Sequence, residues 1–193
     1  MPGPFVLTPE LDAFKLQFEE IANEADAIAG GLTEQQFNWR PGTGGWSVAQ
    51  CIDHLNVSAR VYLPKLDEGI ANAIRQGMYG EGPFRYNALG RLFVWTQQPT
   101  TKMKYKAVKA LQPSPARRKQ DALAAFRAYQ VQYVDRLRQG NGLDLARARV
   151  QSPVVSLLRL PLGSGFALVV AHEQRHLQQA RNVIANPAFP GSA

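Results

Sequence analysis

Histidine is the residue whose placement in this sequence first suggests chemistry. The chain contains three histidines, His54, His172 and His176. His172 and His176 are four residues apart, so on a helix their Cβ atoms lie about 5–6 Å apart on one face. Two such imidazoles can bind one divalent ion at about 2.0–2.1 Å each, whereas the alternative is a pair of hydrogen-bonded core histidines. The spacing predicts a metal site, with His54 as the third ligand from another helix.

Residues 172–176 also read H-E-x-x-H, the zincin pattern in which Glu173 would be the general base. That pattern needs a further ligand downstream, and residues 177–193 contain no His, Asp or Glu. The sequence therefore argues against a zincin protease. Glu173 is rotated about 100° around a helix from His172. We expect it to point away and pair with a surface arginine, with a general-base role as the alternative.

Four segments carry the three-and-four spacing of apolar residues that is typical of amphipathic helices. They are residues 9–29, 47–74, 114–139 and 162–185. Thr8-Pro9, Ser114-Pro115 and the S-x-x-Q capping box of Ser47 and Gln50 mark three starts. The pattern predicts an all-α four-helix bundle, with residues 1–193 as a single domain. His54 can reach the histidine pair only if the second and fourth helices face each other.

A long, partly irregular connection of residues 76–113 joins the second and third helices, which favours a bundle with a crossover connection. A short helical turn is expected near residues 33–37. Residues 82–120 contain no Asp or Glu but nine basic residues, so they form either a solvated surface or a basic rim that guides an anionic ligand. The alternation of lysine with other residues at 102–106 predicts a short extended segment.

Composition limits the class of protein. The net charge is +7, yet 45% hydrophobic and 19% charged residues are ordinary for a globular domain. No apolar run is long enough for a membrane span, no secretory signal opens the chain, and one cysteine excludes an internal disulfide. We expect a cytoplasmic protein in which Cys51 is a small buried residue. Nucleic-acid binding is disfavoured because no recognition motif accompanies the basic segment.

Two motifs carry a resemblance to a known family. N-W-R-P at 38–41, then G-W-S-V-A-Q at 45–50 and His54-Leu55, resembles the W-S-x-x-[EQ]-x-x-x-H-L signature of the DinB/YfiT-like superfamily. His172-x-x-x-His176-x-x-Gln179 resembles the second signature of that group. The resemblance covers both ends of the chain and the order of the helices, and the middle third adds little to it.

The resemblance implies a four-helix bundle, frequently a homodimer, with a three-histidine site that often holds zinc or nickel. It carries over His54, His172 and His176 as the ligands, and Trp46 and Ser47 as the packing and capping start of their helix. Relatives with this signature include transferases and isomerases that use low-molecular-weight thiols such as bacillithiol, mycothiol or glutathione.

Three histidine ligands would leave open positions on a divalent ion, which is typical of catalytic rather than structural sites. We therefore expect a metal-dependent transferase or hydrolase acting on a small substrate, with an anionic substrate and a thiol cosubstrate as options. Gln50 and Gln179 are candidates for orienting a ligand or contacting substrate, although Gln50 alternatively only caps its helix. The competing hypothesis is a non-catalytic stress-response or binding bundle whose metal is structural or absent.

Overall fold

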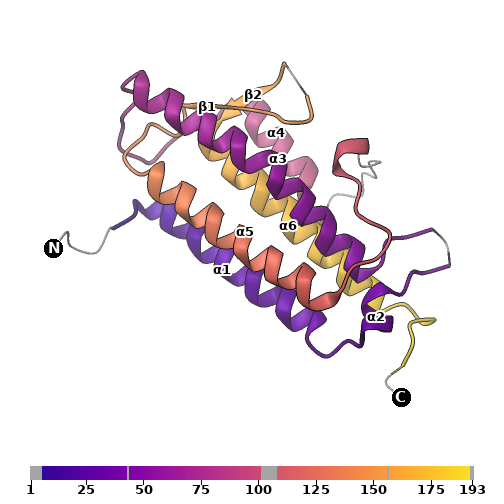
Figure 1. Ribbon diagram of the computed structural model, residues 1–193. Helices are drawn as coiled ribbons and strands as arrows, with labels where there is room; N and C mark the ends of the chain where they lie inside the picture. Colours follow the sequence, from indigo (N-terminus) through magenta and orange to yellow (C-terminus); the bar gives the residue numbers. More distant parts are fainter. Residues whose placement is uncertain (1–5, 43, 101–107, 156, 192–193) are drawn as a thin grey trace.

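Four long helices dominate the computed structural model, which describes residues 6–42, 44–100, 108–155 and 157–191 (Figure 1). They are α1 (Pro9–Ala29), α3 (Val48–Arg75), α5 (Lys119–Gln139) and α6 (Leu162–Ile184). The shorter elements are α2 (Glu34–Asn38), α4 (Ala88–Gln97), the 3-10 turn η1 (Lys109–Leu111) and the strands β1 (Arg149–Gln151) and β2 (Arg159–Pro161). The all-α prediction is confirmed.

The four long helices form a bundle in which α1 and α3 each pack against both α5 and α6 (Figure 1). Helices α1 and α3, which follow one another in the chain, are therefore diagonally opposite. This order requires crossover connections, as the long segment 76–113 predicts. It also places α3 beside α6, so that His54 and the histidine pair share one interface.

The predicted apolar stripes form the core. On α1 the buried residues Leu11, Phe18, Ile21 and Ala25 recur with helical spacing, and Phe18 stacks on Tyr133 of α5 with ring centroids 5.0 Å apart. The capping box at the start of α3 is also present, because Ser47 Oγ accepts from the Gln50 N–H. These local signals place the helices that carry the histidines. None of the described helices is long and apolar enough to cross a membrane.

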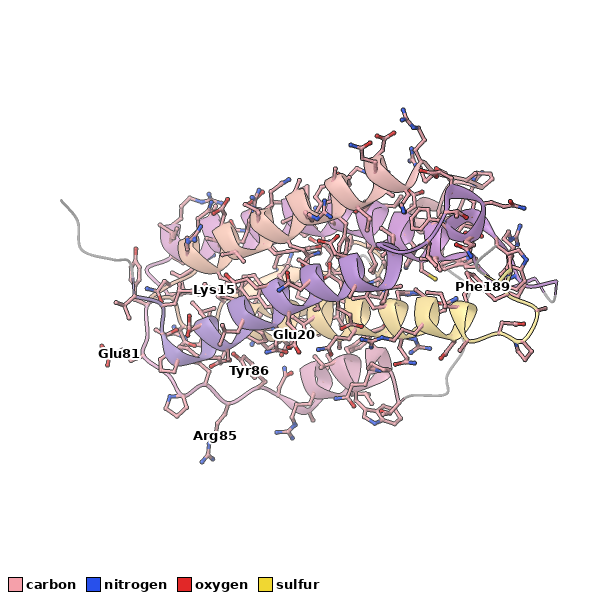
Figure 2. The ribbon with its side chains drawn as sticks, turned by 90° about the horizontal axis from the view of Figure 1, so that it is seen from below. Lys15, Glu20, Glu81, Arg85, Tyr86 and Phe189 are labelled. Carbon is pink, nitrogen blue, oxygen red and sulfur yellow. The ribbon has the colours of Figure 1, made fainter. Side chains whose placement is uncertain are left out.

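Two glycines at the start of α6 allow other segments to approach it closely. A Cβ atom on Gly163 would lie 1.9 Å from the Tyr86 hydroxyl, and one on Gly165 would lie 2.6 Å from Cγ1 of Val150 in β1. Tyr86 also hydrogen-bonds Glu10 of α1, and Figure 2 shows it beside that helix. The segment that leads into α4 is thus fixed to both α1 and α6.

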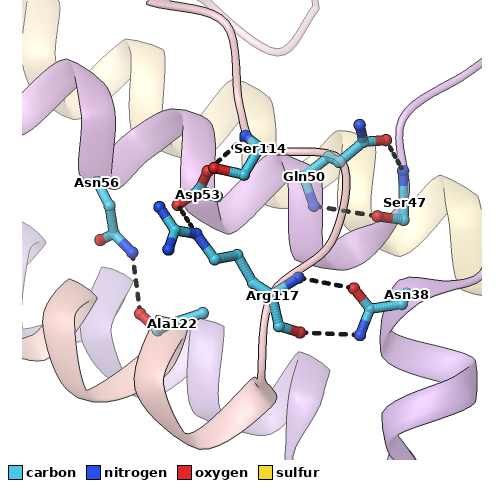
Figure 3. Close-up of polar contacts among 8 residues, drawn as sticks. All are labelled: Asn38, Ser47, Gln50, Asp53, Asn56, Ser114, Arg117 and Ala122. Carbon is cyan, nitrogen blue, oxygen red and sulfur yellow. Dashed lines mark hydrogen bonds and ion pairs between the residues drawn. The ribbon is translucent and has the colours of Figure 1, made fainter.

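The third long helix begins later than the sequence predicts. Ser114 and Pro115 resemble a helix start, but α5 begins at Lys119. The buried Asp53 carboxylate accepts from the Ser114 N–H at 2.7 Å and from Arg117 Nε at 2.8 Å (Figure 3). Asn38 additionally exchanges two hydrogen bonds with the Arg117 backbone. These tertiary contacts hold residues 114–118 outside the helix.

Replacing Asp53 with alanine should lower the free energy of unfolding by about 2–4 kcal/mol, because two hydrogen bonds to a buried carboxylate are lost. Urea denaturation followed by circular dichroism measures this. The control is Asp121→Ala, since Asp121 is exposed in the first turn of α5. Equal stability of the two variants would contradict a structural role for Asp53.

The segment predicted to be irregular contains helix α4, which packs against α6. The Asn87 side chain caps it by accepting from the Gly90 N–H at 2.8 Å. With ten residues, α4 is too short to be stable alone and depends on this packing. The antiparallel pair β1–β2, in which Val150 faces Leu160, was also not predicted. The expected extended segment at 102–106 lies outside the described residues.

Candidate metal centre

The three histidines converge at the interface of α3 and α6. One ring nitrogen from each of His54, His172 and His176 lies within 4.8 Å of the other two. Their ring centroids are 4.5–5.1 Å apart, and His54 Nε2 lies 3.2 Å from His172 Nε2. The predicted convergence of residues 118 positions apart in sequence is therefore confirmed.

The geometry and the tautomers of this cluster fit a metal ion. Two nitrogens bound to one tetrahedral ion at about 2.0–2.1 Å lie about 3.3 Å apart, close to the 3.2 Å observed. His54 Nδ1 lies 2.6 Å from the Leu111 carbonyl oxygen, which can only accept, so this nitrogen donates. His176 Nδ1 similarly lies 3.0 Å from Gln179 Oε1. Because Nδ1 carries the proton in both residues, Nε2 of each keeps the lone pair that can bind a metal.

Burial keeps the three imidazoles neutral. It lowers the pKa of His176 to about 3, with a further contribution from His54. It also holds the pKa of His172 well below the ordinary value and lowers that of His54. Protons therefore do not compete for these nitrogens at neutral pH. A set of three neutral imidazoles suits a divalent transition-metal ion.

Gln179 occupies the orienting position that the sequence predicts as one of its options. Replacing it with alanine should weaken metal binding about 10- to 100-fold, as loss of an outer-shell partner usually does. A competition titration against a chromophoric chelator measures this affinity. Gln178→Ala is the matched control, because the Gln178 amide instead bonds Asn182. Equal affinities of the two variants would show that Gln179 does not orient His176.

Two other candidates near the cluster have structural roles. The Gln50 amide oxygen accepts from the Ser47 N–H at 3.2 Å, so Gln50 caps α3, the alternative left open by the sequence. Cys51 is fully buried, and burial raises the pKa of its thiol to about 12. As predicted, it is a packing residue and not part of the cluster.

The expectation that Glu173 pairs with a surface arginine is wrong. Its side chain is 2% exposed, and Oε1 accepts from Gln130 Nε2 of α5 at 2.9 Å. Burial raises the pKa of Glu173 to about 8. With Ser58 and Tyr133 it lines a cavity of about 10 Å³ behind His172, space for a single water molecule. The reason is that α5 covers this face of α6, so Glu173 points into the bundle.

A larger cavity of about 300 Å³ opens beside all three histidines. Trp46 forms part of its wall and packs on the rings of His54 and His176, with centroids 4.9 and 5.6 Å away. Arg175 also lines it and donates from Nη1 to the Thr96 carbonyl at the end of α4 at 2.7 Å. Trp46 therefore does more than the packing predicted for it. Arg175 was not predicted, because its role depends on α4.

The basic segment 82–120 contributes uncharged residues to this cavity. Its described lining residues are Phe93, Gln97, Val108 and Leu111. Its basic residues Arg117 and Lys119 instead anchor the start of α5, the latter through the carbonyls of Gly30 and Leu32. Among described residues the basic-rim interpretation finds no support at the cavity, and Lys102, Lys104 and Lys106 lie outside them.

Comparison with known proteins agrees with this fold. The chain resembles, with a TM-score of 0.60 and 15% identity, the structure described as "YfiT from Bacillus subtilis is a probable metal-dependent hydrolase with an unusual four-helix bundle topology". The likeness covers 96% of this chain and 92% of the other. No curated protein matches the sequence. The sequence profile of the DinB superfamily matches residues 17–180, and the chain therefore belongs to the DinB superfamily.

Proposed function

We propose that this protein is a metal-dependent enzyme that acts on a small molecule, with hydrolysis as the leading reaction. The observation that carries the proposal is the meeting of three neutral imidazoles with a cavity of about 300 Å³. His54, His172 and His176 would hold a divalent ion, zinc or nickel. The description of YfiT as a probable metal-dependent hydrolase supports this reading.

The ion would supply Lewis acidity, lowering the pKa of a coordinated water or thiol and polarising an oxygen of the substrate. The chain itself orients the ligands through the Leu111 carbonyl and Gln179. Trp46, packed over two of the imidazoles, shields one side of the cluster from water. The described lining of the cavity contains no Asp or Glu, so a protein carboxylate is not assigned as general base there.

Thiol transfer is the second candidate. Arg175 follows His172 by three residues, so it lies on nearly the same face of α6 and also lines the cavity. A guanidinium in this position suits the carboxylate of a low-molecular-weight thiol. In this reaction the thiolate sulfur would form a bond to an electrophilic carbon of the second substrate, whose leaving group departs with the bonding electrons.

The test uses protein purified without a histidine tag, stripped with a chelator and reloaded with zinc or nickel. Hydrolysis of small esters, amides and lactones is measured first, then loss of electrophiles with and without bacillithiol, mycothiol or glutathione. We expect turnover that chelation removes and metal restores. Stoichiometric metal without turnover of any substrate, together with strong destabilisation on chelation, would instead support a structural metal in a non-catalytic bundle.

A further inference from the structure

The cavity beside the histidines has walls of two kinds. Its polar wall belongs to α6, where His172, Arg175 and His176 lie within two turns. The facing wall comes from α4, η1 and the segment after β1. Most of its described residues are apolar, and the polar ones, Gln97 and Ser152, are uncharged. The apolar residues are Phe93, Val108, Leu111, Val154, Val155 and Leu158.

We propose that the substrate carries a small apolar group, alkyl or aryl, which occupies the space along this apolar wall while its reacting head lies at the histidines. The placement of the head at the histidines rests on the proposed function, whereas the apolar subsite does not depend on it. An apolar wall does not solvate a charged or strongly polar body, because buried polar groups need hydrogen-bond partners. It binds hydrocarbon by removing apolar surface from water.

The exposure of the wall indicates that apolar surface remains to be covered. Val108, Val154 and Val155 are 44%, 41% and 48% exposed, although each lines the cavity. A ligand with a hydrocarbon group would bury this surface. The volume of about 300 Å³ is at the lower end of the range for small-molecule sites, so the group is short.

The charge of the site determines which reacting head of the substrate is favoured. Arg175 is the one charged residue among the described lining residues, and an ion held by the neutral imidazoles would add positive charge. An anionic or electron-rich head is therefore favoured at α6, and a cationic one is disfavoured. The two walls together are complementary to an amphiphilic small molecule whose head lies toward α6.

The experiment measures binding, independently of turnover, with two series of probes. Alkyl hydroxamates from acetohydroxamate to hexanohydroxamate are titrated calorimetrically into zinc-loaded protein, since the hydroxamate head binds metals. Primary alcohols from ethanol to hexanol are titrated into metal-free protein, with tryptophan fluorescence as the signal because Trp46 lines the cavity. We expect affinity in both series to rise about threefold to fourfold per methylene until the cavity is full.

A matched pair of variants locates the binding. Val155→Asp places a carboxylate on the apolar wall at a half-exposed position, so it should fold normally. It should lower the affinity for hexanohydroxamate at least tenfold and leave the affinity for acetohydroxamate nearly unchanged. Leu157→Asp is the control, because Leu157 is 95% exposed and is not a lining residue.

The outcomes separate the two proposals. If affinity does not depend on chain length in either series, or if both variants behave alike, the apolar subsite is overturned. If alcohols show the dependence and the effect of Val155→Asp but hydroxamates bind no more tightly than alcohols, the apolar subsite is supported and the metal-dependent function fails.

Discussion

Replacing His54 with alanine is expected to lower the affinity for zinc or nickel by more than about 100-fold and to remove metal-dependent activity. Loss of an outer-shell partner alone usually costs 10- to 100-fold, and this change removes a direct ligand. The remaining pair, His172 and His176, would bind the ion weakly. Mass spectrometry of metal content after dialysis and a chelator competition titration measure the effect.

The fold should survive this change. The core of the bundle is built mainly from apolar side chains of α1, α3, α5 and α6, and His54 is not among them. Its contacts outside the histidine cluster include the Leu111 carbonyl and the Trp46 ring, which lie at the edge of the cavity. Added zinc should raise the melting temperature of the wild-type protein through binding linkage but not that of the variant. Circular dichroism should show equal helical content for both.

Cys51→Ala is the matched control for this experiment. Cys51 lies one turn before His54 on α3, is fully buried and is outside the histidine cluster. The variant should keep its metal while losing some stability through the smaller side chain. Full metal occupancy in His54→Ala, or its loss in Cys51→Ala, would refute the assignment of the ligands.

Replacing Glu173 with glutamine is expected to stabilise the metal-free protein at alkaline pH. Burial raises the pKa of this carboxyl from 4.5 to about 8. Between these values the unfolded chain has lost the proton that the folded protein retains, so the free energy of unfolding falls as pH rises. Since each pH unit is worth about 1.4 kcal/mol per proton, the carboxyl should cost on the order of 3–5 kcal/mol by pH 8.

The measurement is urea denaturation of both proteins at pH 4.5 and pH 8. At pH 4.5 the Glu173 carboxyl is neutral in the folded protein and about half ionised in the unfolded chain, so the difference there reflects mainly packing and hydrogen bonding, including the contact with Gln130. The stability difference should then shift by several kcal/mol in favour of the variant at pH 8. The histidines titrate in both proteins, so their contribution to the pH dependence of stability is the same in each and drops out of the comparison.

Glu20→Gln is the control because Glu20 is exposed on α1. Its stability should follow the wild-type pH dependence. A Glu173→Gln variant with that same dependence would show that the carboxyl is solvated or ionised in the folded protein, contrary to its burial against α5. The result would also decide whether Glu173 could act as a base, since a neutral carboxyl cannot accept a proton at pH 7.

Much of the bundle is predictable from the sequence because helices are specified locally. The spacing of apolar residues along α1 and the capping box of Ser47 and Gln50 involve residues three or four positions apart. The pairing of His172 with His176 is equally local, since one helical turn brings them onto the same face. The chain thus indicates by itself where the helices lie and which histidines are available to a metal.

The tertiary structure alone decides what surrounds those histidines. The Leu111 carbonyl that orients His54 is 57 residues away from it, and Ser114 is 61 residues from the Asp53 carboxylate that delays the start of α5. Glu173 is buried only because α5 covers its face of α6. Helix α4 likewise depends on packing against α6, and the apolar wall of the cavity forms because α4, η1 and the segment after β1 meet there. Contacts between distant segments leave no periodic trace in the sequence, because their geometry is set by how whole helices pack.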